Sequence, residues 1–113
     1  MDSIKGVVRQ ICKLLAAQDY QQISMLTAGI RLSEEEIGKA VSAYDRTLIA
    51  PPERAFDLLN IIEIKTQKFV GVRQWAVVMP LWTKEEGRSD LSMELTVFES
   101  DPVRVELDDI HVL

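Results

Sequence analysis

Cysteine and histidine are almost absent from this sequence, and their scarcity excludes several kinds of site. Cys12 is the one cysteine, so no disulfide can form within the chain, and a lone thiol is typical of a reducing cytoplasm. His111 is the one histidine, so any catalytic triad built on histidine must use it. No pair of Cys or His residues has metal-ligand spacing, and there is no glycine-rich phosphate loop. We therefore expect neither a metal nor a cofactor.

Long apolar runs are also missing. The longest is far shorter than the ~20 residues of a membrane-spanning helix, so we expect no association with a membrane. The segment from Met1 to Gly6 lacks the basic and apolar regions of a secretory signal, which again favours a cytoplasmic protein. Of the 113 residues, 47% are hydrophobic and 27% charged, which predicts a single globular domain over residues 1–113.

Basic residues are not in excess, and the acidic excess lies at one end of the chain. Residues 1–83 carry ten Lys/Arg and nine Asp/Glu, whereas residues 84–113 carry three and nine, which together give the net charge of -5. Without clustered Lys and Arg, we do not expect a nucleic-acid partner. Solubility is the simplest role for the acidic end. A basic protein partner and a divalent cation are the alternatives.

The first half of the chain has helical periodicity. Three helices are predicted, over residues 3–18, 20–27 and 34–46. The first has one apolar stripe, opposite a solvated face that carries Lys5, Arg9 and Lys13. Asp19 is a candidate N-cap for the second helix, and Ser33 with Glu36 forms a capping box for the third. The Pro51-Pro52 pair closes this half, and residues 53–58 could form a further helical turn.

The second half alternates between apolar and polar residues. Four antiparallel strands are predicted, over residues 59–66, 74–83, 90–99 and 103–113. In the last strand the apolar positions are odd up to Leu107 and even from Ile110, so we expect a β-bulge at Asp108-Asp109. Together the two halves predict an α+β fold in which the helices pack on a curled antiparallel sheet.

The strand from Trp75 to Trp82 is apolar on both faces. One alternating set is Trp75, Val77, Met79 and Leu81, and the other is Ala76, Val78, Pro80 and Trp82. The hairpin register decides which set meets the helices, and the sequence leaves it open. In either case an apolar row remains on the face away from the core, which is typical of a subunit interface or a ligand site. The alternative is that a loop or residues 50–58 cover this row.

The order of the elements resembles a known superfold. The run from Trp75 to Leu113, which contains MPLWTKEEGRSDLSMELTVFESDPVRVELDDIHVL, is similar to the C-terminal part of small bacterial proteins of unknown function. Their superfold is the cystatin-like, ketosteroid-isomerase-like (nuclear-transport-factor-like) α+β fold. The segment Ala28–Leu32 is too short for the extra hairpin of many members. The aspartate base and tyrosine donor of the isomerase branch have no matching residues, so the resemblance implies no catalysis.

Two functional hypotheses follow. The first is a non-catalytic interaction or regulatory module, with an immunity-type inhibitor as one version, that acts as a homodimer through a sheet face. The second is a small-molecule-binding protein or enzyme with a pocket between sheet and helices. Asp109 and His111 share one face of a strand, which could orient the ring, although a solvated strand end is the simpler interpretation. The candidate pocket or interface residues are Tyr44, Asp45, Trp75, Met79, Trp82, Asp109 and His111.

Overall fold

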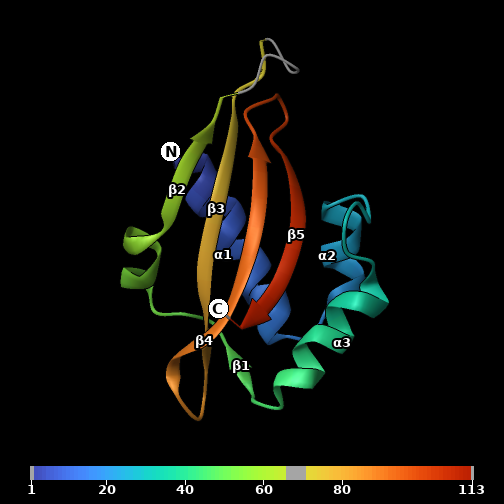
Figure 1. Ribbon diagram of the computed structural model, residues 1–113, viewed down its shortest axis with the longest axis vertical. Coiled ribbons are helices and arrows are strands. Elements are labelled where there is room, and N and C mark those ends of the chain that lie inside the picture. Colours follow the sequence, from blue (N-terminus) through green and yellow to red (C-terminus); the bar gives the residue numbers. More distant parts are fainter. Residues whose placement is uncertain (1, 66–70, 113) are drawn as a thin grey trace.

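The apolar stripe of the first helix forms one wall of the core. The computed structural model describes residues 2–65 and 71–112. Helix α1 (Asp2–Ala16) crosses behind the sheet in Figure 1. Its stripe is fully buried at Ile4, Val8, Ile11 and Leu15, each at most 1% exposed. Burial of this stripe, rather than helical propensity, provides most of the stability of such a helix.

The opposite face of α1 is held by a short helix from the middle of the chain. Residues Glu53–Leu58 form a 3₁₀ helix, η1, at the position where a further helical turn was expected. Lys5 Nζ lies 3.1 Å from Asp57 Oδ1, and Arg9 pairs with Glu53. These half-exposed ion pairs orient η1 more than they stabilise it. Two of the three basic residues of α1 are therefore occupied within the chain.

The predicted caps set the starts of the next two helices. In α2 (Tyr20–Leu26) the Asp19 carboxylate accepts from the Gln22 N–H, at 3.3 Å. In α3 (Glu34–Tyr44) the predicted capping box is confirmed: the Ser33 N–H donates to the Glu36 carboxylate, and the Glu36 N–H donates to the Ser33 hydroxyl. The predicted ends need correction, because left-handed residues stop the helices earlier: Gln18 (φ 59°) follows α1, and Asp45 (φ 54°) ends α3.

The antiparallel sheet confirms the α+β prediction. Its strands are β1 (Leu48–Ile49), β2 (Asn60–Ile64), β3 (Gln74–Thr83), β4 (Gly87–Phe98) and β5 (Arg104–Val112). Within the described ranges the sheet has five strands, in the order β1-β3-β4-β5, with β2 on the same edge of β3 as β1. Two-residue β1 was not predicted, since it is too short to show alternation. The predicted strand ends at residues 66 and 113 lie outside the described residues.

Pairing between β3 and β4 settles which face of β3 meets the helices. Val77, Met79 and Leu81 face the core and are at most 3% exposed, whereas the row from Ala76 to Trp82 faces away. The ladder shifts register between Pro80 and Trp82, since Pro80 pairs with Ser92 but Trp82 pairs with Arg88, and β4 begins at Gly87 rather than at residue 90. This irregularity could not be seen in the alternation of either strand.

The predicted bulge in β5 is confirmed. Leu95 pairs with Leu107, but the preceding residue, Glu94, pairs with Asp109, so Asp108 is the extra residue. Since side chains alternate between the two faces of a strand, one extra residue reverses the facing of everything that follows. Ile110 is consequently in the core, at 5% exposure.

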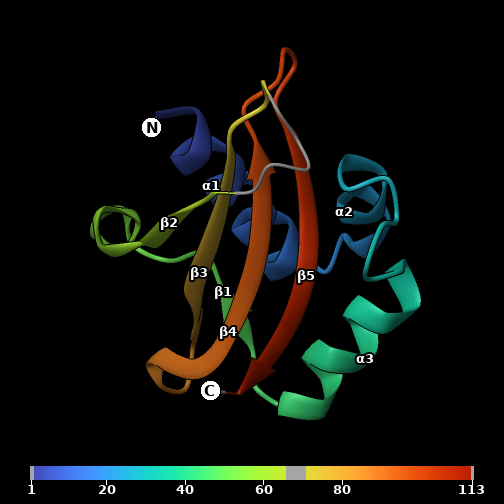
Figure 2. The ribbon, with the colours of Figure 1, turned by 45° about the horizontal axis from the view of Figure 1, so that its top comes forward.

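The helices leave one face of the sheet uncovered. Figures 1 and 2 show α1 behind the strands and α2 and α3 beside β5, where Arg31 forms a bridge with Leu107.

Cys12 is buried on α1, and this burial raises the pKa of its thiol to about 12, so the thiol is inert. Within the described ranges, no helix has both the length and the apolar character needed to cross a bilayer.

The capping box predicts a pH dependence of stability. The Ser33 backbone N–H, and next the Ser33 hydroxyl, lower the pKa of Glu36. A carboxyl with a lowered folded pKa adds stability above its unfolded pKa, and this stability is lost as pH falls through the folded pKa. We expect the free energy of urea unfolding to fall more steeply between about pH 5 and about pH 3 in the wild type than in Glu36→Gln. Glu34→Gln removes an equal charge from the same turn and should keep the wild-type slope; equal slopes in all three proteins would contradict this account.

Candidate functional site

The uncovered face of the sheet, here called the outer face, has two chemically different halves. The apolar half lies on β2 and β3 and consists of Ile62, Ile64, Ala76, Val78 and Pro80. The acidic half lies on β4 and β5 and consists of Glu94, Thr96, Glu106, Asp108, Asp109 and His111. The halves meet between β3 and β4, where Val78 pairs with Glu94 and Ala76 pairs with Thr96. Glu94 in turn pairs with Asp109 on β5.

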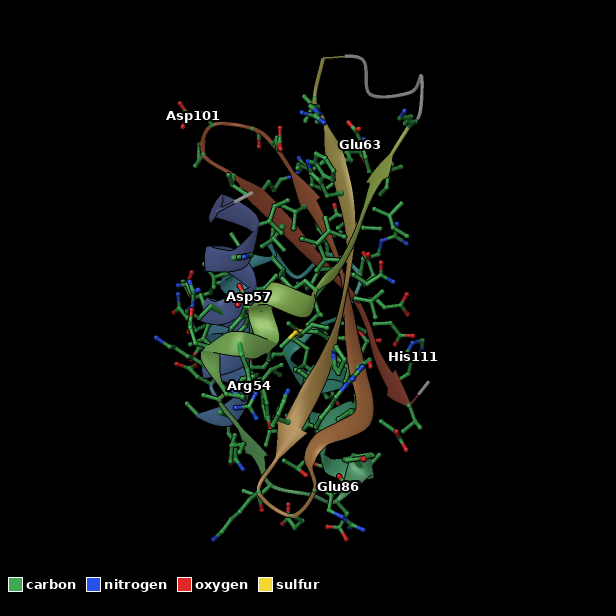
Figure 3. All side chains as sticks on the ribbon, turned by 90° about the vertical axis from the view of Figure 1, so that its left-hand side faces the viewer. Arg54, Asp57, Glu63, Glu86, Asp101 and His111 are labelled. Atoms are coloured by element: carbon green, nitrogen blue, oxygen red, sulfur yellow. The ribbon has the colours of Figure 1, made fainter. Side chains whose placement is uncertain are left out.

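The β5 bulge adds Asp109 and His111 to the acidic half. In an unbroken register, Glu94 would lie opposite Asp108, and Asp109 would point into the core beside Leu107. The bulge instead places Asp109 opposite Glu94, with His111 one alternate position further along the same face. Figure 3 shows His111 on the side of the sheet away from α1 and η1.

The His111 ring lies between two carboxylates from different strands. Its Nε2 is 2.7 Å from Glu94 Oε2, and its Nδ1 is 3.0 Å from Asp109 Oδ2. Despite the short distance, Nε2 is buried without a hydrogen-bond partner among the described residues, so the Glu94 oxygen approaches out of line with the ring N–H. One donor atom from each of the three residues can be chosen so that all lie within 4.8 Å of one another.

The remaining acidic side chains are held by neighbouring groups. The Thr96 hydroxyl donates to Asp108 Oδ2 at 2.6 Å, which connects β4 to the bulge itself. Arg31 Nε lies 3.7 Å from Asp108 and 3.9 Å from Glu106. Arg31 therefore compensates the part of the acidic half that is farther from His111.

A serine lies on the rung next to this group but is not placed as a nucleophile. Ser92 pairs with His111 across the β4–β5 ladder. Together, Ser92, His111 and Asp109 have the composition of a catalytic triad. Ser92 is only 1% exposed, however, and Nε2 of His111 faces Glu94. A nucleophile must reach a substrate, so this arrangement does not support acyl transfer.

Tyr44 and Asp45, predicted to line a pocket, lie at the end of α3 and open onto different hollows. Tyr44 and His111 share a hollow of about 220 Å³, and Asp45 lines another of about 360 Å³. The Tyr44 hydroxyl donates to the carboxylate of Glu86 in the β3–β4 turn, at 2.9 Å. Desolvation, and next this hydrogen bond, raise the pKa of Tyr44. Tyr44 thereby attaches the turn to α3.

The other three predicted residues lie along β3, away from the His111 group. Trp75 donates its indole N–H to Glu99 at 2.9 Å. Met79 faces the core, and Trp82 lines a hollow of about 50 Å³ with it. The Arg54 guanidinium lies 5.9 Å from the Trp82 ring, so η1 covers the Trp82 end of the apolar row.

Of the predicted site residues, the structure brings together Asp109 and His111, and it adds Glu94 from the next strand. Glu94 was missed because its pairing with Asp109 depends on the bulge shift. Applying that shift to an assumed β4–β5 ladder would have found it. A histidine nitrogen and two carboxylate oxygens at this spacing have the composition of a metal-ligand set.

Family comparison places the chain but assigns no activity. The chain belongs to the family described as Domain of unknown function (DUF7668), whose model matches residues 12–113. No curated protein matches the chain. No solved structure matches it either. The function therefore has to be argued from the two halves of the outer face.

The bond between Thr96 and Asp108 gives a test of the bulge. Thr96→Val keeps the shape of the side chain but leaves the carboxylate without this donor, and we expect a loss of about 1–2 kcal/mol in the free energy of urea unfolding. Thr96→Ser retains the hydroxyl and should recover most of that loss. A Thr96→Val variant as stable as the wild type would show that this bond does not stabilise the bulge.

Proposed function

We propose that this family member is a non-catalytic protein-interaction module that acts as a homodimer through the apolar half of its outer face. The observation that carries the proposal is the Ala76–Pro80 part of the apolar row, over which, among the described residues, no helix lies in Figures 1 and 2; η1 reaches only the Trp82 end. At its edge Ile62 is 60% exposed. Ala76 and Val78 continue the row into the sheet and are half-buried.

The chemistry of the apolar half favours a second copy of the chain as its occupant. A two-fold contact places the same patch on both sides, so the patch must be complementary to itself. An uncharged apolar surface meets this condition, and two sheets can stack face to face at about 10 Å. The acidic half does not meet it, because stacking would bring Glu94 and Asp109 against their own copies. The proposed contact therefore uses β2 and β3 and leaves β4 and β5 open.

A non-catalytic role is supported by the way in which the predicted site residues are distributed over different hollows in the described part of the chain. The hollows described above are separate: Tyr44 and His111 share one, Met79 and Trp82 share another, and Asp45 lines a third, so the predicted residues do not all converge on a single hollow. An enzyme site needs an accessible nucleophile or base beside a concave surface. The single reduced cysteine is consistent with action in the cytoplasm.

A basic protein partner on the acidic half is the second candidate. It is favoured by four carboxylates on one side of the sheet, of which Arg31 lies near only Glu106 and Asp108. Such a contact would be formed quickly and weakened by salt. It would be compatible with the homodimer, since the two use different halves of the outer face.

Sedimentation equilibrium tests the homodimer directly. Because the patch is small, we expect a dimer with a dissociation constant on the order of 10 μM. Ile62→Asp and Val78→Asp should each be monomeric at ten times that concentration. The matched control is Met25→Asp, on α2, where the wild-type side chain is 68% exposed but lies outside the outer face. It should dimerise like the wild type.

Circular dichroism and thermal unfolding establish that each variant is folded. A folded wild type that stays monomeric at 100 μM or more would exclude the homodimer at the expected affinity. A dimer unaffected by Ile62→Asp and Val78→Asp would place the contact elsewhere. For the basic partner, binding that survives Ile62→Asp but is lost in Glu106→Lys and in high salt supports the second candidate, and binding that tolerates both contradicts it.

A further inference from the structure

We infer that Glu94, Asp109 and His111 form a site for one divalent transition-metal ion of the zinc class. The three side chains come from two adjacent strands and converge on the outer face at the β5 bulge. One imidazole nitrogen and one oxygen from each carboxylate lie within 4.8 Å of one another. Ligands brought together from paired strands are more rigidly placed than ligands on loops.

The surroundings of His111 provide the second observation. A buried polar atom normally has a hydrogen-bond partner, yet Nε2 has none among the described residues, although Glu94 Oε2 is 2.7 Å away. When the imidazole is neutral, one ring nitrogen presents a lone pair, as do the oxygens of both carboxylates. A cation between them would satisfy all three groups, whereas a further hydrogen-bond acceptor would not.

The local charge also favours a cation. The acidic half carries four carboxylates, and the described ion pairs connect Arg31 only to Glu106 and Asp108. Glu94 and Asp109, which face each other across the ladder, have His111 between them. Opposed carboxylates repel each other, and a divalent ion would remove that repulsion.

The composition of the donor set selects the class of ion. Zinc takes His nitrogen and carboxylate oxygen at about 2.0–2.2 Å, and it often has three protein ligands with water in the fourth position. Calcium needs six to eight oxygen ligands, and magnesium prefers octahedral oxygen. Around a tetrahedral ion the donor atoms would be roughly 3.3 Å apart. Glu94 and Asp109 now contact different nitrogens of the His111 ring, so one ion would require the side chains to turn until both carboxylates reach the same ring nitrogen. The His111 and Glu94 side chains are 39% and 38% exposed, so neither is enclosed in the core.

A competing interpretation uses the same residues without a metal. A protonated His111 could form ion pairs with Glu94 and Asp109, as short N–O contacts on both ring nitrogens would allow. This interpretation predicts no preference for zinc over calcium. The metal site is also independent of the proposed homodimer, because it uses no residue of the apolar half.

Calorimetric titration of the metal-free 113-residue chain with Zn²⁺, at neutral pH in about 0.15 M salt, tests the site. We expect one ion per chain. His111→Ala should weaken binding at least about tenfold, and so should Glu94→Gln and Asp109→Asn. The matched control is Glu106→Gln, which removes a charge from the same acidic half but no proposed ligand, and it should change the affinity less than about threefold. The same titration of Ile62→Asp should give the wild-type result whether or not the chain dimerises.

Nuclear magnetic resonance of the wild-type protein gives a readout that needs no variant. Since His111 is the one histidine of the chain, its ring signals are unambiguous. Stoichiometric Zn²⁺ should shift them, and equal amounts of Ca²⁺ or Mg²⁺ should not. The inference would be overturned if Zn²⁺ left these signals unchanged, or if Ca²⁺ bound as tightly as Zn²⁺. It would equally be overturned if Glu106→Gln weakened binding as much as His111→Ala, since binding would then reflect acidity alone.

Discussion

A single extra residue in β5 is the constraint on which the outer face depends. Up to Leu107 the odd-numbered residues of this strand face the core, and after the bulge Ile110 does so instead. Because side chains alternate strictly along a strand, the exchange turns Asp109 and His111 outward. With an unbroken register, a carboxylate and an imidazole would be buried in an apolar core, which is strongly unfavourable without partners.

The core on one face and polar contacts on the other both maintain the bulge. On the core side Leu95 meets Leu107 and Met93 meets Ile110, so apolar pairs flank the bulge in both directions. On the outer side, the carboxylate of Asp108, the extra residue, accepts a hydrogen bond from the Thr96 hydroxyl and lies near Arg31. The apolar pairs of the core thus determine where the bulge lies, and the contacts on the outer face hold the Asp108 side chain in place.

Local patterns in the sequence were enough to predict the elements of the fold. The capping box at Ser33, the stripe of α1 and the parity change in β5 each involve residues close together in the chain, and each was confirmed. The site required information that local patterns do not contain. Glu94 meets Asp109 only through a shifted inter-strand register, and β1 is too short to have a pattern.

The predicted pocket residues show the same limit. Tyr44 and Asp45 are neighbours in sequence, yet the left-handed turn at Asp45 directs them into different hollows. Trp75 and Trp82 share one strand but lie seven residues apart, so alternation places them on opposite sides of the sheet, and only the pairing of β3 with β4 decides which side meets the core. The aromatic residues of β3 predicted that this strand contributes to a pocket or an interface. They did not indicate which residues each ring would contact.

Cross-strand nuclear Overhauser effects between β4 and β5 test the central claim, the register created by the bulge, most directly. The account predicts backbone contacts between Met93 and Ile110 and between Ser92 and His111. Contacts between Met93 and Asp109 and between Ser92 and Ile110 would mean an unbroken ladder. Asp109 and His111 would then lie on the core side, so the acidic half would lose both residues and the proposed metal site would not exist.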